Sequence, residues 1–160
     1  MSQQNNTKTM NTNYATTNEE NDFNLLLQFN QKLKLKELGR TPQKYPTDAS
    51  GYTQDGRYIE LELKRRFINK DTYQTIIIEP YKLQYAKDNE NIIILYVNFT
   101  NDGHAIVFNL HKVNNIIKRE YNIPSKLYER IKQSNRYELP LKDAYVYKKH
   151  NGEFFLTSKP

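Results

Sequence analysis

The chain has 160 residues, a formal net charge of +6 and no cysteine. This length is sufficient for one domain with a single core. The absence of cysteine excludes disulfide bonds, thiolate nucleophiles and cysteine-ligated zinc. The longest apolar run, residues 92–97, is far shorter than the roughly 20 residues of a membrane-spanning helix. The N-terminus also lacks the basic-then-apolar pattern of a signal peptide. We therefore expect a soluble cytoplasmic protein that has no membrane partner.

The positive charge is concentrated in the last third of the chain. Residues 1–110 contain 13 Lys and Arg and 13 Asp and Glu, whereas residues 111–160 contain 11 and 5. Such a basic segment is typical of a nucleic-acid-binding surface, for which Lys148 and Lys149 are candidate phosphate contacts. A purely solubilising charge is the alternative. Asn, Lys, Ile and Tyr, whose codons are A/T-rich, are abundant, which indicates a phage-type genome and hence the host cytoplasm as location.

The N-terminal quarter divides into a tail and a helix. Residues 1–18 are rich in Asn, Thr and Gln and nearly free of aliphatic residues, which predicts a disordered tail. Residues 19–160 are then expected to form a single domain. From Glu19 to Leu38 apolar residues recur at helical spacing, and Gly39 is a helix stop signal. Pro42 interrupts residues 40–45, where we expect a short edge strand.

The rest of the chain predicts strands with a few helices between them. The expected strands are a hairpin within residues 45–66, then residues 73–78, 92–99, 105–110, 144–149 and 154–157, and the expected helices are residues 80–87, 112–121 and 125–132. Residues 92–99 are apolar at nearly every position, which indicates a central strand covered on both faces. The pattern predicts an α/β fold with a mixed central sheet flanked by helices, followed by a C-terminal helical and β-hairpin extension.

The hairpin places ionisable residues on one face of a strand. Side chains alternate along residues 58–64, so that the apolar residues between them face the core while Glu60, Glu62 and Lys64 share the other face. The position of Asp48 depends on the turn. A two-residue loop would point Asp48 into the core, whereas a three-residue loop ending in Gly56 at positive φ places it opposite Glu62. We favour the second register because an unpaired carboxylate in a core is costly.

Paired carboxylates on one face are suited to binding a cation. Asp48 and Glu62 would supply oxygen ligands to Mg²⁺, with the backbone carbonyl of Leu63 and water completing the shell. A metal ion in that position polarises a phosphodiester and activates water. Lys64 would stabilise the charge that develops on the phosphate. Arg65 and Arg66 would hold neighbouring phosphates.

These residues carry a resemblance to a known superfamily. Asp48 followed fourteen residues later by Glu62-Leu63-Lys64, within an order of helix, strands, helix and strand, resembles the PD-(D/E)xK nucleases, and is similar to small phage nucleases and archaeal-type Holliday junction resolvases. The likeness covers residues 19–99. It implies a restriction-endonuclease-like αβββαβ core, in which Asp48 and Glu62 bind the metal and Lys64 assists catalysis. One departure is that Pro46 stands one residue early.

The resemblance also implies two further site residues and a function. A glutamate of the first helix often joins such a site, which points to Glu20, and a residue of the second helix contacts substrate, which points to Lys82. The implied activity is a Mg²⁺- or Mn²⁺-dependent DNA endonuclease or resolvase, with RNA and a homodimer left open. Two alternatives fit the same sequence: a catalytically inactive protein of the same fold that acts as a binding or virion module, and a basic nucleic-acid-binding module of other ancestry. An E-x-K pattern by itself is also common on solvent-exposed strands.

Overall fold

The computed structural model describes residues 3–124 and 131–160, and the surroundings of the side chains of residues 18–120 and 136–160. Within these residues the helices are α1 (Gln3–Leu33), η1 (Lys70–Thr72), α2 (Pro80–Asp88) and η2 (Leu141–Asp143), and the strands are β1 (Lys36–Arg40), β2 (Ala49–Tyr52), β3 (Tyr58–Arg65), β4 (Thr75–Ile78), β5 (Ile93–Phe99), β6 (His104–Asn109), β7 (Ile117–Pro124), β8 (Ile131–Pro140), β9 (Tyr145–His150) and β10 (Glu153–Ser158). None of the described helices has the length and apolarity needed to cross a membrane.

The centre of the fold is a mixed sheet. Its described part has seven strands in the order β1-β2-β3-β5-β6-β9-β10. The only parallel pair in this part is β3 with β5, and the chain connects the two through α2. The helix α1, the antiparallel meander β1-β2-β3, the helix α2 and the parallel strand β5 together reproduce the αβββαβ order. The predicted α/β class with a mixed central sheet flanked by helices is therefore confirmed.

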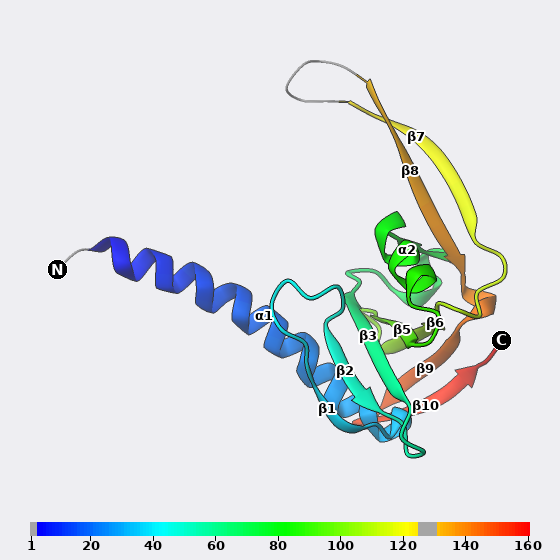
Figure 1. Ribbon diagram of the computed structural model, residues 1–160, viewed down its shortest axis with the longest axis horizontal. Coiled ribbons are helices and arrows are strands. Elements are labelled where there is room, and N and C mark those ends of the chain that lie inside the picture. Colours follow the sequence, from blue (N-terminus) through cyan, green and yellow to red (C-terminus); the bar gives the residue numbers. More distant parts are fainter. Residues whose placement is uncertain (1–2, 125–130) are drawn as a thin grey trace.

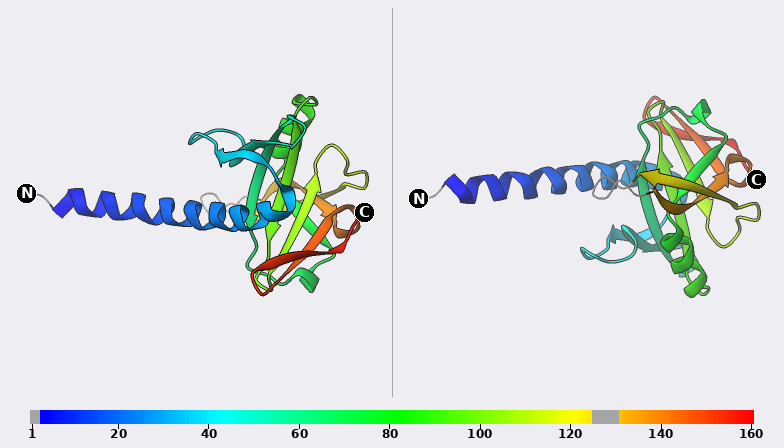
Figure 2. Two further views of the ribbon diagram at one scale, coloured as in Figure 1. Left: turned by 90° about the horizontal axis from the view of Figure 1, so that it is seen from below. Right: turned by 90° about the horizontal axis from the view of Figure 1, so that it is seen from above.

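The two faces of this sheet are covered by different elements (Figures 1 and 2). On one face α1 inserts Leu26 and Phe29, both fully buried, against Leu61 and neighbouring residues of the sheet. On the other face Ala86 of α2 and the isoleucines of β4 pack against Tyr96 and its neighbours. Because β3 and β5 lie in the middle of the sheet and are covered on both sides, burial of their apolar side chains stabilises the domain most.

The helix α1 ends earlier than the sequence predicts. It stops at Leu33, and Lys34 takes a positive φ of 56°. The side chain of Asn30 then bridges the end, because its Oδ1 accepts from the N–H of Leu35 at 2.9 Å and its Nδ2 donates to the carbonyl of Leu35 at 3.1 Å. The expected helix to residue 38 is thus wrong: residues 36–40 form the edge strand β1, somewhat before the position predicted for it.

The largest difference from the sequence prediction concerns residues 112–132. The helix expected over residues 112–121 is wrong, because residues 117–124 form β7, which pairs with β8. The second expected helix falls mainly on residues 125–130, which lie outside the described residues, and its last two residues belong to β8. β7 and β8 form a long arm that extends from the body (Figure 1). The base of β8 pairs with β4, so the strand predicted near residues 73–78 exists but belongs to a second, three-stranded sheet.

The N-terminal part of α1 projects away from the sheet (Figures 1 and 2). The helix begins at Gln3, within the segment for which the sequence predicts disorder. The described side chains that reach the core begin at Phe23. A boundary near residue 18 between a tail and the domain stays a prediction.

Deletion of residues 1–17 should leave the melting temperature within about 2 °C of the full chain, because the projecting segment offers almost no apolar area to bury. Phe29→Ala is the matched control: this ring is fully buried and makes edge contacts with Phe99, Tyr147 and Phe154. Its loss should destabilise the protein by about 3–5 kcal/mol. Thermal unfolding followed by circular dichroism checks both. A truncation that melts many degrees lower would show that the segment is docked on the domain.

Candidate active site

The site lies on the polar face of β3, where α2 covers the sheet. The register of the hairpin is the bulged one: Ala49 pairs with Leu61 and Gly51 with Ile59, and Gly56 has a φ of +86°. Continuing this register places Asp48 opposite Glu62, and the N–H of Asp48 donates to the carbonyl of Leu61 at 2.9 Å. The predicted register is confirmed, and the carboxylates of Asp48 and Glu62 face the same side of the sheet.

The two carboxylates influence each other electrostatically. Glu62 is 8% exposed, and burial, reinforced by the charge of Asp48, raises its pKa to about 7. Asp48 is exposed as a residue, yet its carboxylate turns towards the protein, where the N–H of Leu63 donates to Oδ2 at 2.8 Å. Partial burial raises the pKa of Asp48 and outweighs this hydrogen bond. Holding both carboxylates ionised therefore requires a nearby cation.

Lys82 of α2 provides that cation in the structure. Its ammonium donates to Oε1 of Glu62 and lies 3.5 Å from Oε2 of Glu79, and its side chain is only 11% exposed. The ammonium also lies 6.0 Å from the ring centroid of Tyr96. Burial opposes the charge of Lys82, but the bond to Glu62 and the nearby carboxylates raise its pKa overall. The resemblance predicts that Lys82 contacts substrate, whereas here it neutralises Glu62.

Lys64 stands at the rim of the same site. Its side chain is 41% exposed, and its ammonium lies 4.0 Å from Oε1 of Glu79. Glu79 is the N-cap residue of α2 and contacts both Lys64 and Lys82. Glu79 is not among the site residues that the sequence pattern predicts. A signal was present, because a carboxylate directly before Pro80 marks the start of a helix.

Glu60, on the same face of β3, is fully buried rather than facing solvent. Three tyrosine hydroxyls donate to its carboxylate: Tyr45 at 2.7 Å, Tyr58 at 2.9 Å and Tyr85 at 2.5 Å. Burial and these bonds raise the pKa of Tyr58 to about 12 and raise the pKa of Tyr85 as well. This cluster attaches α2 and the loop before β2 to β3. The face that carries Glu60, Glu62 and Lys64 is therefore an interior face lined by α2, not a solvated one.

The α1 carboxylates that raise the pKa of Asp48 are Asp22 and Glu19. Asp22 forms an ion pair with Arg65 at 2.6 Å, and Glu19 forms one with Arg40. Glu20, the residue that the resemblance points to, is exposed, and its place among metal ligands stays a prediction.

The arginines and lysines that are predicted to contact phosphate form hydrogen bonds or ion pairs within the protein. Arg65 pairs with α1, and Arg66 donates through Nε to Oδ1 of Asn98 at 3.0 Å. Lys148 donates to the carbonyl of Asp102, and Lys149 donates to Oε1 of Gln28 at 2.6 Å. Both lysines lie on β9, which β5 and β6 separate from β3. They are not part of the carboxylate site, and their role as phosphate contacts stays a prediction.

The residues present fit a hard divalent cation that takes two carboxylate ligands from the protein, Asp48 and Glu62. Within the described residues no three His, Cys, Asp or Glu side chains gather closely enough to hold a metal ion. However, among the same residues neither Oδ1 of Asp48 nor Oε2 of Glu62 has a hydrogen-bond partner, since the contacts of these side chains go to the other oxygen. Mg²⁺ is commonly bound by one or two carboxylates, with water and substrate phosphate as the other ligands.

Comparisons with known proteins give a likeness among solved structures. No protein-family model and no curated protein matches the chain. Among solved structures, the Holliday junction resolvase of the archaeal hyperthermophile Archaeoglobus fulgidus is similar, with 9% sequence identity and a TM-score of 0.44. The alignment covers 76% of this chain and 87% of the resolvase.

The raised pKa of Glu62 predicts a pH dependence of stability. The folded protein keeps a proton on Glu62 up to about pH 7, whereas the unfolded chain releases it near the ordinary value of 4.5. The free energy of unfolding should therefore fall as pH rises through this window. Glu62→Gln lacks the titration, so its stability relative to the wild type should improve by roughly 2 kcal/mol between about pH 5 and about pH 8 in EDTA.

Chemical unfolding of both proteins across this pH range measures the difference. Glu90→Gln removes an exposed carboxylate beyond α2 and is the matched control, whose curve should run parallel to that of the wild type. A Glu62→Gln curve that also runs parallel would contradict the raised pKa.

Proposed function

We propose that the chain is a divalent-metal-dependent deoxyribonuclease, an endonuclease or resolvase that hydrolyses phosphodiester bonds in DNA. The observation that supports this most is that Asp48, directly before β2, lies opposite Glu62 of β3. Each of the two carboxylates has one oxygen without a partner among the described residues. Lys64 follows Glu62 by two residues on β3, and the ammonium of Lys82 on α2 contacts Glu62. Two coupled carboxylates with two lysines are the groups that metal-assisted phosphoryl transfer requires.

The roles of the residues follow from their positions. Asp48 and Glu62 would hold Mg²⁺ or Mn²⁺, together with the carbonyl of Leu63, and the ion would supply charge stabilisation and an activated water. Lys64 is half exposed and has only a long contact to Glu79, so its ammonium is free to turn towards a phosphate oxygen. Lys82, on α2, contacts Oε1 of Glu62 and would hold the carboxylate of Glu62 in one orientation.

The partner is DNA, with RNA as the other substrate to be tested. The surplus of positive charge in residues 111–160 favours a polyanion. The β7-β8 arm belongs to this segment. On β7 the side chain of Arg119 is 58% exposed and forms an ion pair with Glu138 of β8. A phage origin and a location in the host cytoplasm rest on the composition of the chain alone.

One observation favours a second candidate, a catalytically inactive nucleic-acid-binding module on the same fold. The ammonium of Lys82 already neutralises Glu62, and the described residues offer no third carboxylate ligand. A buried ion pair of this kind can replace a metal ion structurally. In this case the protein would bind DNA in a salt-dependent manner without cleaving it.

The deciding experiment is incubation of the protein with branched, duplex and single-stranded DNA, and with RNA, in Mg²⁺, Mn²⁺ or EDTA. Cleavage that requires the metal supports the nuclease. Binding without cleavage under every condition supports the inactive module. If neither binding nor cleavage occurs, both proposals fail.

Lys64→Ala should reduce cleavage by at least about 100-fold while leaving DNA affinity within about twofold, because the lysine acts on developing charge and not on the ion. Glu62→Ala should reduce cleavage and also weaken Mg²⁺ binding, since one of two anionic ligands is lost. Lys87→Ala removes an exposed charge at the far end of α2 and is the matched control. Single-turnover cleavage and calorimetric titration with metal measure these effects. Full activity in Lys64→Ala would place the catalytic site elsewhere.

A further inference from the structure

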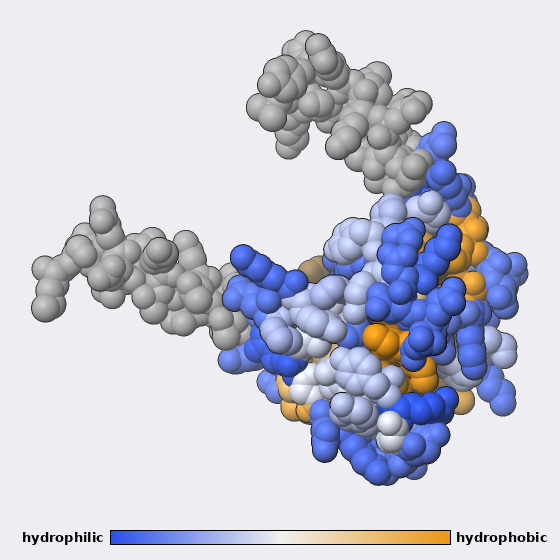
Figure 3. All heavy atoms as spheres, in the orientation of Figure 1, coloured by the Kyte–Doolittle hydropathy of each residue, from blue (hydrophilic) through white to orange (hydrophobic). Residues whose placement is uncertain are grey.

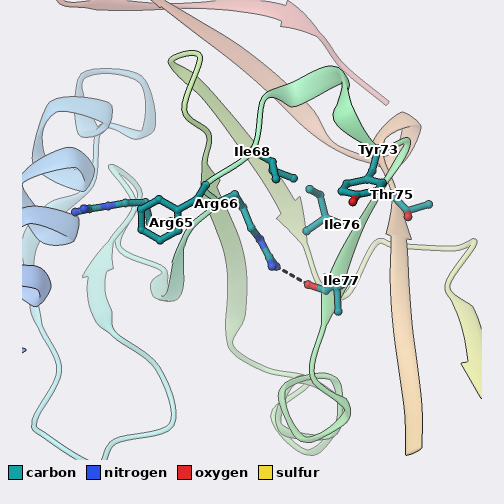
Figure 4. Close-up of a pocket in the computed structure, with 8 residues that line it drawn as sticks. Arg65, Arg66, Ile68, Tyr73, Thr75, Ile76 and Ile77 are labelled. Carbon is teal, nitrogen blue, oxygen red and sulfur yellow. Dashed lines mark hydrogen bonds between the residues drawn. The ribbon is translucent and has the colours of Figure 1, made fainter. Parts of the chain in front are cut away.

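A recess opens immediately after the candidate catalytic strand. Residues 65–68, at and beyond the end of β3, together with Tyr73 and residues 75–77 of β4, line a hollow of about 300 Å³ (Figure 4). This volume lies at the lower end of the range for small-ligand pockets. Apolar side chains dominate its rim, and three are strongly exposed: Phe67 at 77%, Tyr73 at 61% and Ile77 at 41%.

Of the eleven large apolar side chains that are exposed among the described residues, three lie around this one hollow: Phe67, Tyr73 and Ile77. Figure 3 shows apolar residues as small patches on an otherwise hydrophilic face. Two aromatic rings and an isoleucine that remain exposed around one hollow indicate a binding surface more than a packing defect. The described lining contains no carboxylate, and of its two arginines Arg66 points across the hollow while Arg65 pairs with Asp22 of α1, so one cation faces the recess, which suits a flat apolar group attached to an anion.

One wall of the recess is a fixed guanidinium. Arg66 points across the recess towards Ile77, whereas Arg65 points the other way, towards α1 (Figure 4). Nη2 of Arg66 donates to the carbonyl of Ile77 and to the hydroxyl of Tyr96, both at 2.5 Å. Among the described residues Nη1 of Arg66 has no protein partner, so its N–H groups remain for a ligand. A planar cation beside exposed aromatic rings is a stacking surface for a nucleobase.

The recess adjoins the carboxylate site through a single side chain. The ring centroid of Tyr96 lies 6.0 Å from Cζ of Arg66 and 6.0 Å from Nζ of Lys82, and Lys82 contacts Glu62. Along the chain, Lys64 is separated from Arg66 by one residue. A nucleic acid whose phosphate lay at the carboxylates would therefore have a neighbouring nucleotide near the recess.

We propose that this recess binds one unstacked nucleobase, held between the aromatic rim and Arg66, next to the phosphate at Asp48 and Glu62. The inference rests on the proposed nuclease function and specifies its substrate class. A base inside an intact duplex is stacked and paired and has to leave the helix to enter such a recess. The substrate is therefore DNA with an unpaired base beside the scissile phosphate, as at a branch, flap or bulge, in preference to continuous duplex.

The test compares the affinities of the full-length protein for three DNAs in EDTA: a duplex with one bulged base, the same duplex with an abasic residue at the bulge, and the fully paired duplex. The wild type should bind the bulged base about tenfold more tightly than the other two, as expected for one base stacked on aromatic side chains. Phe67→Ala and Tyr73→Ala should each reduce this preference to less than threefold and leave affinity for the paired duplex within twofold. Tyr145→Ala is the matched control, since this tyrosine is 43% exposed on β9, outside the recess.

Both substituted side chains are exposed, so the variants should fold, and circular dichroism verifies this. An undiminished preference in both variants, or an equal loss of affinity for all three DNAs, overturns the proposal. So does an oligomer that dissociates in Phe67→Ala while DNA preference is unchanged, because the apolar rim would then be a protein interface.

The outcome is separable from that of the proposed function. Cleavage in Mg²⁺ without any preference for the bulged base refutes the recess and leaves the nuclease. A recess-dependent preference without cleavage under any metal supports the recess and refutes the nuclease.

Discussion

The structure around β3 depends on one buried contact, between the ammonium of Lys82 and the carboxyl group of Glu62. A helix that covers the polar face of a central strand must pair or hydrogen-bond the carboxyl groups it buries, because a buried charge without partners is strongly destabilising. α2 meets this requirement with an ammonium for Glu62 and the hydroxyl of Tyr85 for Glu60. The contacts that satisfy the carboxylates therefore also determine where α2 lies on the sheet, and with it the position of Glu79.

The same pair accounts for the electrostatics of the candidate site. Burial alone would keep Glu62 protonated to still higher pH, and Lys82 lowers its pKa only part of the way. A metal ion and Lys82 would act on the same carboxylate, and they need not exclude each other, since Lys82 uses Oε1 and leaves Oε2 without a partner among the described residues. A carboxylate shared in this way keeps its orientation whether or not a metal is bound, which is the preorganisation that electrostatic catalysis requires.

The sequence predicted what local rules determine and missed what distant contacts determine. Alternation along β3 and the turn ending in Gly56 were sufficient for the register, because a strand face and a hairpin loop are local features. The burial of Glu60 was not predictable, since it depends on tyrosines 15 residues before it and 25 residues after it. Residues 112–121 were predicted as helix from local spacing, whereas pairing of β7 with β8 gives a strand. At the early end of α1 the side chain of Asn30 contacts the backbone of Leu35 beyond the helix, and the spacing of apolar residues gives no sign of such a polar contact.

Tyr96 connects the candidate site to the recess beside it. Its ring is fully buried in the central strand β5, with Lys82 on the side of the candidate site and Arg66 on the side of the recess. Its hydroxyl donates to the carbonyl of Ile77 at 3.1 Å and accepts from Arg66, and burial raises its pKa to about 12, so it remains a neutral donor. A side chain with this many fixed contacts in a central strand has little freedom to move. The carboxylates and the guanidinium of Arg66 are therefore both placed against one rigid side chain of the central sheet, while the aromatic rim of the recess lies in the connection between β3 and β4.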